Sequence, residues 1–130
     1  MGFKISPAPD VEEMAKSIVT VLPEFSHINN SRVFYVRSTG SKARAYARIW
    51  ELPSIWQNVL SIGPYYIIEV LSQNFDKLPA EEKTKVIIHE LLHIPKTFSG
   101  SIKPHRCFKD RIDRKIVNRL YEKYVALLSQ

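Results

Sequence analysis

The spacing of apolar residues predicts a helix at each end of the chain and a third between them. Residues 11–22, about 79–93 and about 111–128 carry apolar side chains three or four positions apart, which places those side chains on one helical face. Asp10 begins a capping-box pattern before the first of these helices. Because Pro95 disfavours helical geometry at the residue before it, we expect the middle helix to end just after His93.

Between the first two helices, the pattern predicts three strands and a short helix. Residues 32–37 are β-branched and aromatic, residues 42–50 alternate with a period of two, and residues 65–71 are apolar on both faces. Residues 54–60 fit the short helix. The fold class predicted is therefore α+β, with an N-terminal helix, a small three-stranded sheet, a middle helix and a C-terminal helix in a single domain over residues 1–130.

The middle helix contains a His-Glu-x-x-His (HExxH) motif, which is typical of a zinc-binding helix. Residues four apart lie on the same helical face, so His89 and His93 can direct both imidazoles at one ion. Glu90 lies about a quarter turn away, where its carboxylate can take a proton from a zinc-bound water. The neighbours of the motif are the apolar residues Val86, Ile87, Leu91 and Ile94. This setting favours a buried metal helix over a solvated one.

A catalytic zinc ion usually has three protein ligands and a water, so the motif needs a third ligand. His105 follows His93 after eleven residues that include two prolines and a glycine, which predicts a loop able to fold back onto the helix end. We expect His105 to be the third metal ligand and His27 to be structural. The chain also offers other candidates for the third position: Cys107, Asp110 and Glu122.

Composition places the chain among ordinary globular proteins. It has 130 residues, 45% of them hydrophobic and 25% charged. No apolar run reaches the roughly 18–20 residues of a membrane span, and the N-terminal residues lack the apolar segment of a secretory signal. The single cysteine excludes an internal disulfide framework and favours a reducing compartment. We therefore expect a cytoplasmic protein with no membrane partner.

The net charge of +6 lies in the C-terminal part of the chain. Residues 1–95 contain ten basic and ten acidic residues, whereas residues 96–130 contain nine basic and three acidic ones. A basic region beside the predicted metal site indicates an acidic substrate or a nucleic acid nearby, although a solvated helix face would have the same composition.

The order of the elements and the run from His89 to Gly100, continuing to Pro104 and His105, resemble the zincin superfamily. The resemblance is greatest to the small metallopeptidases of archaea and phages, and it extends from about Tyr46 to Tyr124. More distantly, the chain is similar to the SprT-like proteases, which act on DNA-bound proteins and share the zinc helix and a downstream histidine.

The resemblance implies a minimal zincin-like fold with His89, His93 and His105 as Zn²⁺ ligands and Glu90 as the catalytic base. Lys96 stands where metzincins have a glycine, which excludes a metzincin. The sequence therefore predicts a zinc-dependent metallopeptidase that acts on a peptide or protein substrate. The alternative is a nucleic-acid-associated zinc-binding protein, or a protease acting on DNA-bound proteins, that uses the basic C-terminal region. The sequence does not indicate an oligomeric state.

Overall fold

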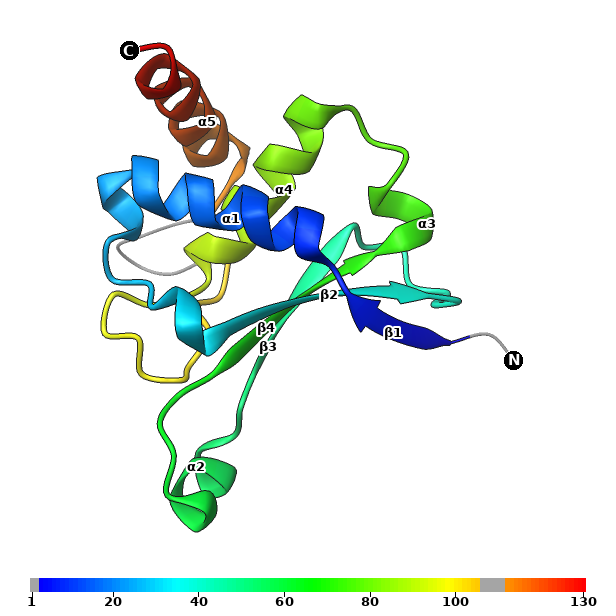
Figure 1. Ribbon diagram of the computed structural model, residues 1–130, viewed down its shortest axis with the longest axis vertical. Helices are drawn as coiled ribbons and strands as arrows, with labels where there is room; N and C mark the ends of the chain where they lie inside the picture. The colour runs from blue at the N-terminus through cyan, green and yellow to red at the C-terminus, as the bar shows by residue number, and fades with distance from the viewer. Residues whose placement is uncertain (1–2, 106–111) are drawn as a thin grey trace.

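The computed structural model describes residues 3–105 and 112–130, and Figure 1 shows the order of their elements. The strands are β1 (Lys4–Pro7), β2 (Val33–Thr39), β3 (Ala47–Glu51) and β4 (Tyr66–Leu71). The helices are α1 (Pro9–Val21), α2 (Ser54–Leu60), α3 (Ser72–Phe75), α4 (Ala80–Leu92) and α5 (Arg114–Leu128). Two short 3₁₀ turns, Pro23–Phe25 and Asn30–Arg32, connect α1 to β2.

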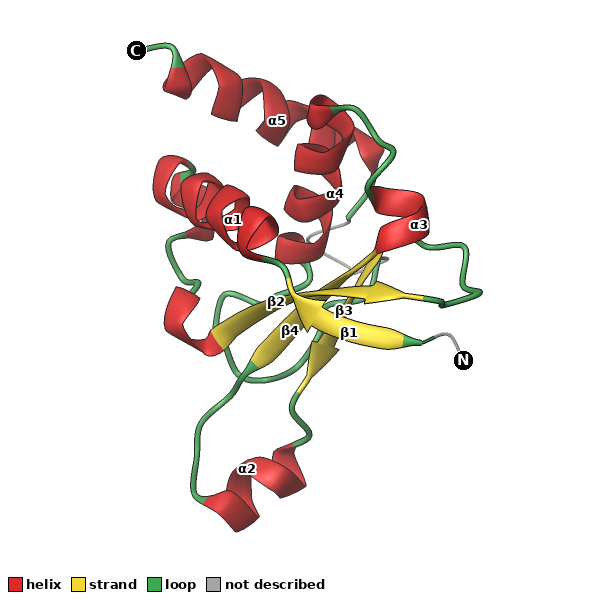
Figure 2. Cartoon of the chain, turned by 45° about the vertical axis from the view of Figure 1, so that its right-hand side comes forward, coloured by secondary structure: helices red, strands yellow, loops and turns green. Residues whose placement is uncertain are grey.

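The strands form one sheet in the order β1-β2-β4-β3, which leaves β3 as an edge strand. The β2–β4 pair is parallel, and the β1–β2 and β3–β4 pairs are antiparallel. Helices α1, α4 and α5 lie on one side of the sheet (Figures 1 and 2). The predicted α+β class is confirmed, and the architecture is compatible with a small zincin-like fold.

The sheet has four strands rather than the three predicted. All four residues of β1 are exposed, and the strand pairs with β2 from Lys4 opposite Thr39 to Pro7 opposite Val36. Such a short strand has no buried side chain to produce a period-two pattern, and only its backbone pairing defines it. For that reason the apolar pattern gave no sign of it.

The strand predicted over residues 42–50 is correct only in its second half, because β3 begins at Ala47. Before that point, the side-chain amide of Asn74, on α3, donates to the carbonyls of Ala43 (3.1 Å) and Ala45 (2.9 Å). These carbonyls are bonded by a side chain instead of a neighbouring strand. The alternation of apolar and polar residues therefore begins at residue 42, whereas the hydrogen-bonded pairing with β4 begins at Ala47.

The capping role predicted for Asp10 is wrong. Helix α1 begins at Pro9, and Ala8 precedes it without a side-chain cap. The Asp10 carboxylate instead accepts hydrogen bonds from Arg37 of β2, at 3.0 and 2.9 Å. A bidentate pair with a guanidinium is a stronger interaction than a single cap bond, so the carboxylate joins the helix to the sheet.

The core lies between the sheet and the three long helices. Helix α1 contributes Val11, Ala15 and Ile18, while α5 contributes Val117, Leu120 and Tyr124. Helix α5 starts at an Asp113 cap, whose carboxylate accepts from the Ile116 amide at 3.0 Å. Over residues 3–105 and 112–130, no helix combines the length and the apolar character needed to cross a membrane.

Candidate metal centre

Helix α4 presents two histidines from consecutive turns. Its buried side chains include Ile87, Ile88 and Leu91, which pack into the core and fix the rotation of the helix. His89 and His93 lie at the other side, with ring centroids 5.2 Å apart. His93 is the residue that ends the helix, as the position of Pro95 predicts. The four-residue spacing therefore places both rings at the same end of the helix.

The loop after α4 brings His105 to these two rings. Its Nε2 lies 3.0 Å from Nε2 of His89, and its ring centroid lies 4.7 Å from that of His93. Metal-binding atoms of all three histidines lie within 4.8 Å of one another. Two nitrogens bound to one zinc ion at roughly 2.0–2.1 Å lie no more than about 4.2 Å apart, which the His89–His105 separation satisfies. The three imidazoles thus form a group that could hold one metal ion.

None of the other candidates for the third ligand is found beside the three histidines in the described residues. Glu122 lies on α5, is exposed, and does not belong to the three-histidine group found among the described residues. Cys107 and Asp110 lie outside the described residues. His27, which we expected to be structural, does not belong to the three-histidine group. Its Nε2 lies 3.1 Å from the carbonyl oxygen of Ile94. Since a carbonyl accepts, the His27 ring donates to it.

The backbone of Lys103 joins the loop that carries His105 to His93 at the end of α4. Its amide donates to the His93 carbonyl at 2.8 Å, and its carbonyl accepts from Nδ1 of the His93 ring. Because a carbonyl only accepts, the proton of this ring stands on Nδ1, which leaves the Nε2 lone pair for a metal. The His105 carbonyl in turn accepts from the Ile112 amide at 3.0 Å. The backbone at Lys103 and at His105 itself is therefore hydrogen-bonded to other parts of the chain.

Tyr66 of β4 holds the middle of the same loop. Its hydroxyl donates to the Ser101 carbonyl at 2.8 Å and accepts from the Gly100 amide at 2.9 Å. Gly100 has a φ of 94°, and a side chain there would come within 2.6 Å of the Gln57 amide. Only glycine suits this backbone and this space. Phe98 packs edge-on against the Tyr66 ring, at 5.2 Å between centroids.

We expect Tyr66→Phe to loosen the loop that carries His105. The substitution leaves the buried Gly100 amide without its partner, which costs about 1–3 kcal/mol of the free energy of unfolding. Zinc affinity should fall by about tenfold, because the metal must then order the loop. Both quantities are measured by urea unfolding and by competition with a chromophoric chelator. Tyr65→Phe is the control, and equal zinc affinities in the two variants would contradict the role of Tyr66.

Burial shifts the titration of the groups at the centre. It lowers the pKa of His89 to about 4, with the neighbouring His93 and His105 adding to the effect. The pKa of His93 is also lowered, chiefly by burial. These imidazoles are therefore unprotonated at neutral pH, the form that binds metal. Burial raises the pKa of Glu90 from its usual 4.5 to about 7, which is suited to a general base.

The raised pKa of Glu90 predicts a pH-dependent stability of the metal-free protein. Its contribution is fully present below the unfolded pKa of 4.5 and is lost as the pH rises through about 7. The lowered pKa of His89 acts in the opposite direction, through a contribution that is present above 6.5 and lost as the pH falls toward about 4. Above pH 7, only the penalty of the ionised glutamate therefore remains.

In the presence of chelator, we expect Glu90→Gln to be more stable than wild type by about 1–3 kcal/mol at about pH 8. The difference should shrink to nearly zero at about pH 4.5, where the wild-type carboxyl is protonated in the folded state and already about half protonated in the unfolded state. Urea unfolding at the two pH values measures it. Glu82→Gln, at an exposed position of the same helix, is the control. A difference that is the same at both pH values would contradict the assignment.

The three histidines and Glu90 line a cleft of about 980 Å³ between β3, α4 and the first turns of α5. Residues 45–49 form one wall, and Lys85, Arg114 and Asn118 lie opposite or beside it. The sequence analysis did not assign Tyr66, Lys85 or Arg114 to the site. Nothing in the sequence set Tyr66 apart from Tyr65 beside it. Arg114 belonged to the basic C-terminal region, which the sequence placed beside the site without assigning single residues, and the apolar spacing of the middle helix gave no role to Lys85.

The comparisons with known proteins bear directly on this centre. The model of a family described as "Putative phage metallopeptidase" matches residues 3–125, which is nearly the whole chain. The matched range includes the three histidines and Glu90. Searches of curated proteins and of solved structures gave no significant match. The resemblance to the small phage and archaeal metallopeptidases is thus confirmed, over a longer range than residues 46–124. By this match, which supports a metal-dependent protease, the chain belongs to the phage metallopeptidase family.

Proposed function

We propose that the protein is a zinc-dependent endopeptidase with Glu90 as its general base. The observation that carries this proposal is the placement of a buried glutamate and three histidines along one open cleft. A glutamate that is only 7% exposed, with no cation bonded to it among the described residues, has a raised pKa and can accept a proton near neutral pH.

Strand β3 is suited to hold an extended substrate beside the histidines. It is the edge strand, and residues 45–49 line the cleft. The Leu71 amide donates to the Tyr46 carbonyl at 2.9 Å, so in an antiparallel ladder Arg48 and Trp50 also face β4 with their backbone groups. The backbone groups of Ala47 and Ile49 therefore point away from the sheet. No strand among the described residues lies on that side of β3, so these groups can pair with a peptide that adds a strand to this edge.

The residues of the chain then divide the work of hydrolysis. The three histidines would hold the metal, and the Lys103 carbonyl fixes the tautomer of His93. A bound zinc ion supplies a Lewis acid and lowers the pKa of water. The Glu90 carboxylate takes a proton from the attacking water and delivers it to the nitrogen of the leaving amine. Ala47 and Ile49 keep the scissile segment extended along the cleft.

The test is cleavage of a mixture of unfolded proteins and peptides by zinc-loaded protein, with the new termini mapped by mass spectrometry. We expect new termini to appear with the zinc-loaded sample, to be absent after chelation, and to return when zinc is added back. Cleavage that persists unchanged in the chelated sample would contradict a metal-dependent peptidase.

A second proposal is that the basic C-terminal region recruits the protein to nucleic acid. Arg114, Lys115 and Arg119 are exposed on α5, and Arg114 also lines the cleft. Such binding would weaken steeply with salt, because it depends on neutralising phosphates. Fluorescence anisotropy with a labelled DNA duplex measures it. No binding at low salt would contradict this second proposal and leave the peptidase proposal unaffected.

A further inference from the structure

A large apolar surface lies on the side of the molecule away from α1, α4 and α5. One part of it, the open face, is the side of the sheet that no helix within residues 3–105 and 112–130 covers. Phe34, Ile67 and Trp50 are cross-strand neighbours on β2, β4 and β3, which places their side chains in one row. Ile5 on β1 and Phe3 beside it extend the surface. These five side chains are 39–59% exposed.

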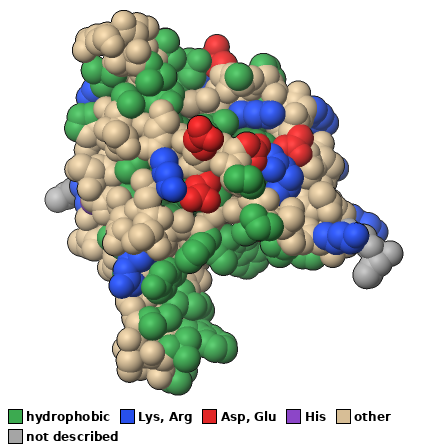
Figure 3. Space-filling view, in the orientation of Figure 1, with side chains coloured by type: hydrophobic (Ala, Val, Ile, Leu, Met, Phe, Trp, Pro, Cys, Tyr) green, Lys and Arg blue, Asp and Glu red, His purple; other side chains and the backbone are tan. Residues whose placement is uncertain are grey.

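The second part is the arm, which we define as residues 52–64 and which includes α2. It projects from the body of the molecule, as Figures 1 and 2 show, and in the space-filling view of Figure 3 hydrophobic atoms cover much of it and continue along the adjoining edge of the sheet. The arm contains no charged residue. Five of its large apolar side chains are 39–75% exposed: Ile55, Trp56, Val59, Leu60 and Ile62.

The size of this surface exceeds what a monomer ordinarily exposes. A fully exposed aromatic side chain presents roughly 150–250 Å², and aliphatic ones somewhat less, so ten side chains at about half exposure present on the order of 1,000 Å². The largest apolar patch of a typical monomer is roughly 300–600 Å². A stable interface buries roughly 800 Å² on each partner. The surface is therefore large enough to support a dimer by itself.

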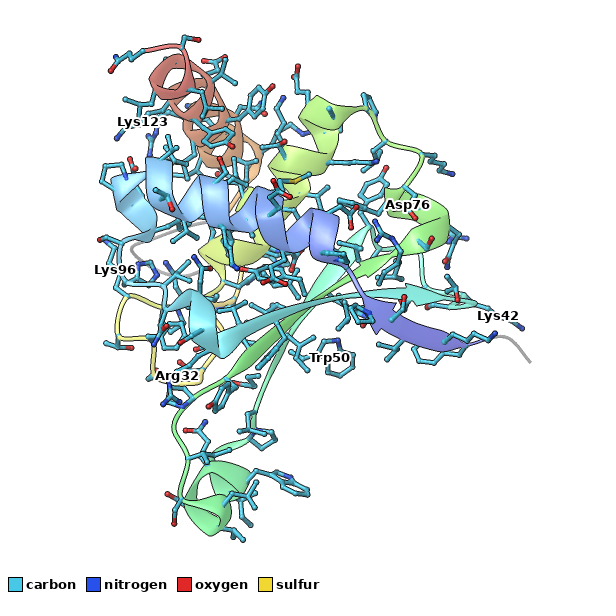
Figure 4. All side chains as sticks on the ribbon, viewed as in Figure 1. Arg32, Lys42, Trp50, Asp76, Lys96 and Lys123 are labelled. Carbon is cyan, nitrogen blue, oxygen red and sulfur yellow. The ribbon has the colours of Figure 1, made fainter. Side chains whose placement is uncertain are left out.

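The polar group at the centre of the open face is already satisfied within the chain. Glu69 is only 2% exposed, and its carboxylate accepts from Arg48 at 2.9 Å and from the indole of Trp50 at 2.8 Å. Figure 4 shows Trp50 on the side of the sheet opposite to α1. Covering this face would thus bury no unpaired carboxylate, which removes the main cost of placing an acidic residue in an interface.

We propose that a second copy of this chain covers the surface, with the arm of each copy lying on the open face of the other. The arm and the open face adjoin, so a two-fold axis can pair both at once and close the assembly. The absence of charge in the arm agrees with the charge depletion at the centre of homodimer interfaces. A helix that binds anionic lipid carries Lys or Arg on its polar face, whereas the polar residues of α2 include Gln57 and Asn58.

Sedimentation equilibrium of the full chain tests the proposal, with Val59→Asp as the variant. Val59 is 75% exposed in the single chain, so aspartate there leaves the fold intact but places a charge in the interface. We expect wild type to have twice the 15.1 kDa mass of the chain, and Val59→Asp to dimerise at least about 100-fold more weakly. Val125→Asp makes the same substitution at an exposed position of α5 and should remain dimeric. Ile55→Asp repeats the test if Val59→Asp does not fold.

Tryptophan fluorescence identifies the surface that is buried. The two tryptophans of the chain, Trp50 and Trp56, both belong to the apolar surface. Their emission should shift to shorter wavelength as wild type and Val125→Asp are concentrated, and should not shift in Val59→Asp. A wild-type protein that is monomeric at about 100 µM would overturn the proposal. If that monomer also bound phosphatidylcholine vesicles, a lipid surface would be the partner of the apolar surface instead. A dimer whose emission and mass are unaffected by Val59→Asp would overturn it as well.

Discussion

Replacing Glu90 with glutamine is expected to lower peptide hydrolysis by about 10²–10⁴-fold while zinc stays bound. The amide has nearly the same shape as the carboxylate but cannot accept a proton, so the loss isolates the role of Glu90 as a base. The comparison is of kcat/KM for a peptide found in the cleavage mixture, together with zinc content for both proteins.

Glu82→Gln is the matched control for this prediction. Glu82 lies on the same helix, lines the same cleft and is exposed. It should keep hydrolysis within about threefold of wild type, because a surface substitution changes little. If Glu90→Gln cleaved as fast as Glu82→Gln, water activation would have to depend on another residue.

Replacing His105 with alanine is expected to weaken zinc binding by at least about 100-fold, since even the loss of an outer partner of a ligand costs 10–100-fold in affinity. His89 and His93 alone would leave two protein ligands where catalytic zinc sites have three. Competition with a chromophoric chelator gives the dissociation constants of both proteins.

His27→Gln is the control for a histidine outside the centre. It keeps a side-chain donor near the Ile94 carbonyl and should leave zinc affinity unchanged. Unchanged affinity in His105→Ala itself would contradict the assignment and would transfer the third position to Cys107, Asp110 or Glu122.

The chemistry of the centre could be predicted from sequence because it depends on short-range spacing. The four-residue interval between His89 and His93 places both rings on one helical face in any α-helix. Pro95 predicted that this helix ends just after His93, and in the structure His93 is the C-terminal cap of α4. The loop to His105 was short enough, and rich enough in proline and glycine, to predict a return to the helix.

What the sequence did not reveal depends on contacts between distant segments. The local pattern predicted that Asp10 caps the first helix, but the side chain binds Arg37, 27 positions away, instead. Strand β3 begins only at Ala47 because Asn74 binds the carbonyls before it, and the position of the loop that carries His105 depends on Tyr66. Strand order cannot be read from periodicity, because period two defines which face a residue occupies and not which strand lies beside it.

Zinc K-edge X-ray absorption of the reconstituted protein tests the central claim most directly, because it counts the ligands and identifies their atoms. A site made by His89, His93 and His105 predicts one zinc ion per chain. It should have three imidazole nitrogens and one oxygen, all at about 2.0–2.2 Å. A sulfur ligand at about 2.3 Å, or a chain that retains no zinc, would contradict it.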